Sequence, residues 1–252
     1  MQPIYRQIRQ RARQIILRFP TPDFYLDHAP AYETSKRLFD TNPIIKKLFS
    51  FVANTLENNF GHGLIHAVKV SHDAGSLIFI EAQASGLDPE RLSRLVCLVH
   101  SAGLLHDIMR KKKDHAIRAA AHAKKLLKSY PFSSEEIGNI CNAIQNHEAF
   151  KDNIDADTPD GALISNSLYD ADKFRWGPDN FHDTLWDMVS YLNPPLAKFI
   201  DGYPKGMEKL EKIKKTFRTA TGKKYGPQFI DLGLAIGEEL YRVIKTEFSG
   251  YS

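Results

Sequence analysis

Helix-forming signals follow one another along most of this chain, and few segments read as β-strands. Asp88-Pro89-Glu90 joins an N-cap residue to a proline at the first helical position. Ser133-Ser134-Glu135-Glu136 has the pattern of a capping box, and Asn42-Pro43 marks a further helix start. Pro194-Pro195 breaks the pattern near the C-terminus. The sequence therefore predicts an all-α fold built as a helical bundle.

The helix signals predict three parts. Residues 1–30 form a basic N-terminal helix and a linker, residues 31–178 a helical core, and residues 179–252 a C-terminal helical elaboration packed on the core. The first helix, over residues 5–19, carries five arginines among its apolar residues. We expect it to be a solvated helix packed on the main domain, with contact to a membrane surface or RNA as the alternative. Asp114 and Asp179 are expected to cap helices, and the last helix is expected over residues 227–247.

Composition limits the class of protein. A chain of 252 residues holds one large domain, or one domain and an appendage. The net charge of +4 favours an anionic substrate but is too small to indicate nucleic acid. Cys97 and Cys141 lack metal-ligand spacing and are typical of core residues in a reducing compartment. No apolar run could span a membrane and no secretory signal is visible, so we expect a cytoplasmic protein, with homo-oligomerisation left open.

Apolar helical stripes end in histidine or aspartate at several places. These polar residues are His66, His106, His147 and Asp172, with Asp107 beside His106. A single histidine at such a position is usually a core residue with a hydrogen-bond partner. Buried carboxylates, however, cost several kcal/mol unless they are paired or bind a metal. Four helices that turn such residues inward therefore predict a buried divalent-metal site.

Three separated motifs resemble the signature of the HD superfamily. They are His66-Ala67-Val68-Lys69-Val70, Leu104-Leu105-His106-Asp107-Ile108 and Asp170-Ala171-Asp172-Lys173-Phe174. The resemblance implies an HD-domain helical bundle with additional N- and C-terminal helices. It also implies that His66, His106, Asp107 and Asp172 bind one metal. Asp170 would then either orient a ligand imidazole or lie exposed in a turn or helix.

Two further histidines resemble those of the dinuclear branches of the superfamily. His115 begins a helix of small residues, and His147 ends the next helix. The six residues would hold two metals bridged by Asp107, whereas in mononuclear members the equivalent histidines contact substrate phosphate. The implied cofactor is therefore one or two divalent ions, drawn from Mn, Fe, Ni, Co, Mg and Zn.

Several residues near these motifs are candidates for chemistry. We expect Asp107 to orient a metal-bound water and count His115 and Lys69 with it as catalytic candidates. The substrate-binding candidates are His62, Arg110 and Lys173. Against this, the basic run at residues 110–113 has the ordinary interpretation of a solvated loop, and His62 that of a helix-entry residue.

The resemblance implies a metal-dependent hydrolase of a phosphate ester or anhydride. Its partner would be a small phosphorylated substrate, a nucleotide or another phosphorylated metabolite, and nucleic acid is not expected. Hydrolysis of guanosine tetra- and pentaphosphate is a narrower alternative. A di-iron oxygenase that cleaves C–C or C–P bonds is one rival, because the same ligands hold iron. A non-catalytic module that binds a metal or nucleotide is the other.

Overall fold

The fold is all-α, as the sequence predicts. The computed structural model describes residues 2–55, 63–83 and 86–248, and over these ranges every regular element is a helix. The elements are α1 (Pro3–Ile16), α2 (Asp23–Asp27), α3 (Ala29–Thr41), α4 (Pro43–Thr55), α5 (Leu64–Ala82), α6 (Pro89–Leu105), α7 (His115–Leu126), η2 (Leu127–Ser129), α8 (Ser134–Gln145), α9 (Pro159–Phe174), η3 (Asn180–Thr184), α10 (Leu185–Leu192), α11 (Leu196–Ile213) and α12 (Ala220–Glu247). Among these described helices, none is long and apolar enough to cross a bilayer.

Two helix starts that position the site are capped as predicted. The Ser133 hydroxyl accepts a hydrogen bond from the Glu136 backbone N–H at 3.2 Å, and the Ser133 N–H donates to Glu136 Oε2 at 2.7 Å. At α6, the Arg91 backbone N–H donates to Asp88 Oδ1 at 2.9 Å. Both caps satisfy backbone N–H groups that the first helical turn leaves without partners.

Two expected capping hydrogen bonds do not form, and one expected helix start was wrong. Asp114 has a left-handed backbone (φ 55°) and its side chain makes no cap hydrogen bond. Asp179 also makes no cap hydrogen bond, because its carboxylate binds Arg175 and Lys69 instead. Helix α12 begins at Ala220, before Pro227, because the Thr219 hydroxyl accepts from the Gly222 N–H at 2.8 Å. In addition, the expected linker contains the short helix α2, whose Phe24 is fully buried.

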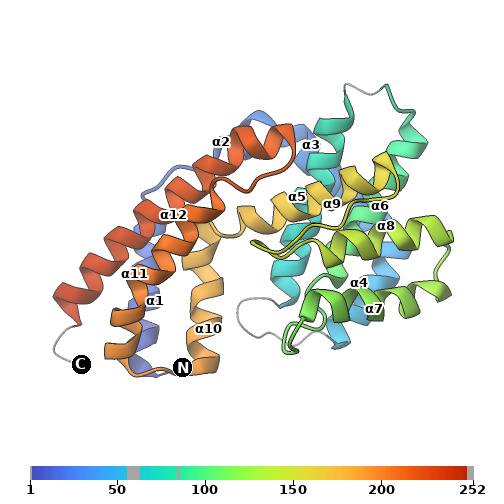
Figure 1. Ribbon diagram of the computed structural model, residues 1–252. Helices are drawn as coiled ribbons and strands as arrows, with labels where there is room; N and C mark the ends of the chain where they lie inside the picture. The colour runs from blue at the N-terminus through green and yellow to red at the C-terminus, as the bar shows by residue number, and fades with distance from the viewer. Residues whose placement is uncertain (1, 56–62, 84–85, 249–252) are drawn as a thin grey trace.

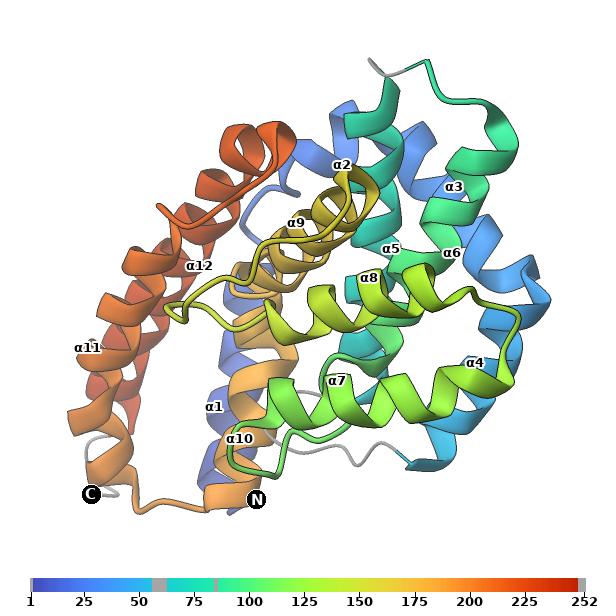
Figure 2. The same cartoon turned by 45° about the vertical axis from the view of Figure 1, so that its right-hand side comes forward.

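The helices form two apolar clusters. The larger lies among α3 to α9 and includes Leu77, Val99, Ile140 and Leu168. The second joins α1 to the C-terminal helices through residues such as Ile8, Trp186 and Leu240. Figures 1 and 2 show the two groups of helices side by side, with α9 leading from the first towards the second. The ordinary interpretation of the N-terminal helix fits this packing, since its apolar face is buried.

Candidate metal centre

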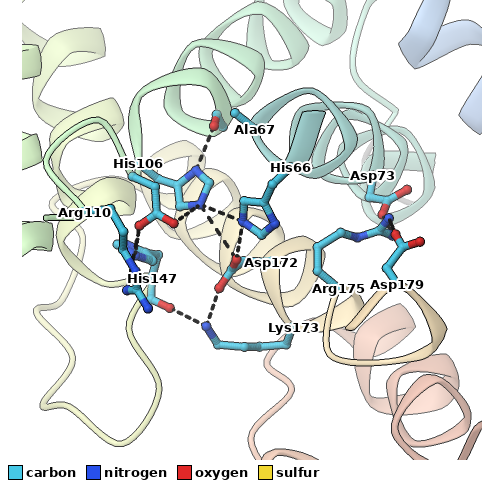
Figure 3. A network of polar contacts seen from close by, with 12 residues as sticks. His66, Ala67, Asp73, His106, Arg110, His147, Asp172, Lys173, Arg175 and Asp179 are labelled. Carbon is cyan, nitrogen blue, oxygen red and sulfur yellow. Dashed lines mark hydrogen bonds and ion pairs between the residues drawn. The ribbon is translucent and has the colours of Figure 1, made fainter. Parts of the chain in front are cut away.

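Five helices bring the six predicted ligands to one place. His66 lies in the first turn of α5, and Asp172 in the last turn of α9. His106 caps the C-terminus of α6 with Asp107 directly after it, His115 opens α7, and His147 follows α8. All six side chains are buried. Because each residue lies at or near a helix end, its side chain reaches the centre without breaking a helix. Figure 3 shows His66, His106 and Asp172 pointing towards one another.

The first group of ligand atoms surrounds His106. The His66 and His106 Nε2 atoms are 3.3 Å apart, and His66 Nε2 lies 3.1 Å from Asp172 Oδ1. His106 Nε2 is 3.6 Å from Asp107 Oδ2. The His106 Nδ1–H donates to the Gly103 carbonyl at 2.7 Å, so its Nε2 carries a lone pair directed at the cluster. Lone pairs and carboxylates gathered this closely form a suitable site for a cation.

The second group lies on the other side of the same aspartate. Asp107 Oδ1 is 3.3 Å from His115 Nε2 and 3.4 Å from His147 Nε2, and these two nitrogens are 3.3 Å apart. The His147 Nδ1–H donates to the Ile144 carbonyl at 2.6 Å, which leaves its Nε2 as an acceptor. Asp107 is therefore the residue common to two groups, each of which could hold one ion.

The donor set fits a divalent metal ion. Imidazole nitrogens mixed with carboxylate oxygens suit Mn, Fe, Co, Ni and Zn, and the donors alone do not select one of them. Asp107 is 2% exposed and Asp172 is 4% exposed. Carboxylates buried to this extent need a nearby cation or several hydrogen-bond donors, because transfer of the charge from water is costly. The buried group of histidines and aspartates therefore could hold a metal ion.

The protonation states suit ligands. Burial lowers the pKa of His106 to about 3, so its imidazole is neutral near neutral pH. Burial alone would raise the pKa of Asp172. The Lys173 ammonium and the hydrogen bond with His66 outweigh that effect and hold this pKa well below its usual range. Asp172 is therefore ionised.

Lys173 turns into the protein, not towards a substrate as predicted. Its ammonium donates to the His147 carbonyl at 2.8 Å and forms an ion pair with Asp172. It also lies 4.9 Å from the centre of the Tyr169 ring and is 3% exposed. With these contacts, Lys173 holds Asp172 and the chain at His147 in position.

Arg110 faces the candidate centre. Its Nη1 lies 2.7 Å from His115 Nε2 and 3.9 Å from Asp107 Oδ1, and its side chain also lines a cavity beside His66. The following residues of the basic run, Lys111 to Lys113, are exposed. The run therefore divides into one arginine directed at the site and three lysines at the surface.

Lys69 belongs to a neighbouring ion-pair network. Its ammonium lies 3.1 Å from Asp179 Oδ1 and 3.8 Å from Asp183 Oδ2, so the structure pairs this predicted catalytic residue with these carboxylates. The Arg175 guanidinium binds Asp73 and Asp179 (Figure 3). It also binds the Tyr25 hydroxyl. The sequence reasoning missed Asp73. It lies seven residues after His66, on the same helix face, which was the available signal.

Asp170 has neither of its expected roles. Its carboxylate accepts hydrogen bonds from the Arg218 and Thr219 backbone N–H groups, both at 2.8 Å, and from the Thr219 hydroxyl at 2.7 Å. Asp170 is therefore buried and anchors the start of α12 to α9. His62, predicted to contact substrate, lies outside the described residues.

Comparison with known protein families, curated proteins and solved structures finds no match to this chain. The likeness to the HD superfamily therefore rests on the three sequence motifs. The buried cluster that these motifs form is compatible with an HD-type site.

Proposed function

We propose that this protein is a metal-dependent phosphohydrolase of the HD type, acting on a phosphate ester or anhydride. The observation that carries the proposal is the shared Asp107. Its two carboxylate oxygens face two groups of histidines, and Arg110 lies beside one of them. This arrangement combines a place for an activated water with a fixed positive charge for a phosphoryl group.

The residues of the site have separate roles in this reaction. A divalent ion bound by His66, His106, Asp107 and Asp172 would lower the pKa of a bound water and withdraw charge from phosphorus. Asp107 orients the water through a carboxylate oxygen, and Lys173 keeps Asp172 ionised and in place. Arg110 binds a phosphoryl oxygen through a charge-assisted hydrogen bond. His115 and His147 either complete a second ion site or contact the phosphate directly.

The reaction is a simple hydrolysis. The water oxygen forms a bond to phosphorus and the P–O bond to the leaving group breaks. The proton that the water loses balances the proton that the leaving oxygen gains. No oxidant or second cofactor is needed. Among the described side chains, the charged residues that line the adjacent cavity are Arg110, Arg175, Lys198 and Lys209, and an anionic substrate matches their charge.

The test is phosphate release from an aryl phosphate and a nucleotide panel, with added manganese, nickel or cobalt. We expect metal-dependent release by the native chain and a loss of more than about 100-fold in Asp107→Asn. Even partners that only support metal ligands contribute 10–100-fold to affinity or activity. Asp155→Asn, which changes an exposed carboxylate outside the cluster, is the matched control and should keep full activity.

Two results would contradict the proposal. One is the absence of phosphate release with every metal and substrate tested, from a folded protein. The other is purified protein that holds two irons and consumes dioxygen without releasing phosphate, which would indicate the oxygenase chemistry instead.

A further inference from the structure

A cavity of about 450 Å³ joins the candidate metal centre to the C-terminal helices. Its lining includes His66 and Arg110 from the centre, and otherwise comes from the end of α9 through η3, α10 and α11. This volume lies within the range of ordinary small-molecule sites, about 300–1,000 Å³. Because the cavity reaches a metal ligand, a molecule whose phosphate lies at the centre would place the rest of its structure here.

The wall away from the metal centre is mainly apolar. It includes Trp176, Phe181, Leu185, Phe199, Met207 and Leu210. Tyr203 contributes its ring, since its hydroxyl donates to the Gly237 carbonyl at 2.9 Å. The uncharged polar side chains of the lining are those of Asn180 and Thr184. Apart from Lys198 and Lys209, such a wall offers few partners for the base and ribose of a nucleotide, which need several hydrogen bonds.

Two glycines of α11 leave room along this wall. Gly202 and Gly206 are four residues apart, so they lie on the same face of the helix, and both line the cavity. A Cβ atom added at either position would meet no atom within 4 Å. Larger side chains would therefore enter open space without displacing the protein.

We propose that the substrate is a phosphate ester of a predominantly apolar alcohol. This inference rests on the phosphohydrolase function proposed above and narrows its substrate class. The phosphate lies between the candidate metal centre and Arg110, and Lys198 and Lys209 of α11 also line the cavity. The apolar chain lies along α11, against Phe199 and Met207. Burial of that chain removes apolar surface from water and supplies the binding energy.

The experiment compares ethyl, butyl and octyl phosphate with a nucleoside monophosphate, below the micelle-forming concentration and with the activating metal. Each methylene removed from water is worth about fourfold in affinity. We expect kcat/KM to rise by about 100-fold or more from ethyl to octyl phosphate, with the nucleoside monophosphate below octyl phosphate.

Narrowing the cavity should remove this preference. In a Gly202→Leu, Gly206→Leu double variant we expect octyl phosphate turnover to fall by about tenfold or more, because four or more buried methylenes lose their space. Ethyl phosphate turnover should stay within about twofold. Gly138→Leu is the matched control, since Gly138 is an exposed helical glycine of α8 whose added Cβ also meets nothing within 4 Å. It should leave both rates unchanged.

The outcomes separate the two proposals. Equal kcat/KM for ethyl and octyl phosphate, a higher kcat/KM for the nucleoside monophosphate, or a double variant that keeps the octyl preference would overturn the apolar substrate while leaving the hydrolase intact. Failure to hydrolyse any phosphate ester or anhydride would overturn both.

Discussion

Helices α5 and α6 bring together two pairs of buried histidines, and the pairs differ in their neighbours. At one end, His66 and His106 face Asp107 and Asp172. Further along the same two helices, His72 and His100 lie against Ser35 and aromatic rings. The helices, the residue type and the burial are alike, so the comparison isolates the effect of the carboxylates.

The second pair is neutral imidazole, and His72 Nε2 and His100 Nδ1 are buried without a hydrogen-bond partner among the described residues. The Ser35 hydroxyl lies 3.0 Å from His100 Nε2 and donates to the His72 carbonyl at 2.7 Å. The Phe39 ring packs edge-on against both imidazoles. Burial lowers the pKa of His72 to about 4 and that of His100 to about 3. Burial of a histidine therefore does not by itself indicate a metal site, and the two aspartates distinguish the candidate metal centre.

The largest expected effect is a difference between two substitutions on α6. His106→Gln should weaken metal binding by more than about 100-fold, because a direct ligand contributes more than its supporting partners. His100→Gln replaces an equally buried histidine one and a half turns earlier and should leave metal affinity unchanged. Isothermal titration of the folded variants with manganese or zinc measures both. Equal losses of metal affinity in the two variants would show that the two histidine pairs do not differ in metal binding.

A second prediction concerns a carboxylate that lies near the centre without belonging to it. Asp170→Ala leaves two backbone N–H groups at the start of α12 without their acceptor. It should therefore lower the free energy of unfolding by about 1–3 kcal/mol. Metal affinity should be unchanged. Urea unfolding measures the loss of stability, and metal titration measures the metal affinity. A large loss of metal affinity in folded Asp170→Ala would indicate that Asp170 orients a metal ligand.

The smallest expected effect is a pH dependence from the pair without carboxylates. The pKa of His100 is about 3 in the folded chain and about 6.5 when unfolded. Between these values the unfolded chain binds a proton that the folded chain does not. The stability that neutral His100 contributes is therefore lost as the pH falls through this range, by up to about 1.4 kcal/mol per pH unit.

The measurement compares the free energy of unfolding in urea of the native protein with that of His100→Gln. Both proteins are metal-free, and both are measured at about pH 7.5 and about pH 5.5. Stability of the native protein should fall further than that of the variant by about 1–2 kcal/mol over this interval. The comparison with His100→Gln is needed because burial raises the pKa values of Asp73 and Asp170 to about 6. Their effect on stability as the pH falls is opposite to that of His100. Parallel slopes in the two proteins would contradict the assignment.

Local patterns in the sequence predicted the elements that the site needs. The caps at Asp88 and Ser133 and the ends of the apolar stripes depend on residues within a few positions of one another. These patterns place His106 and His147 at helix ends, where the structure finds them.

Contacts between distant segments were not predictable in this way. Asp170 binds backbone groups 48 and 49 residues away, and Arg175 reaches Asp73 across 102 residues. Lys173 was expected to reach substrate because it flanks a proposed metal ligand, yet its ammonium has partners inside the protein. Helical periodicity specifies the face that a side chain occupies and leaves its partner on another helix unspecified.

We propose that Asp107 and its neighbours, and not the other histidine pair, bind metal. The most direct measurement is anomalous X-ray scattering from crystals of the metal-loaded protein, recorded at the absorption edge of the bound metal. We expect a peak within bonding distance of the His66 and His106 Nε2 atoms, Asp107 and Asp172. A second peak beside His115 and His147 would show that both groups are filled. A peak at His72 and His100, or none near Asp107, would show that metal does not bind at the carboxylate-bearing pair.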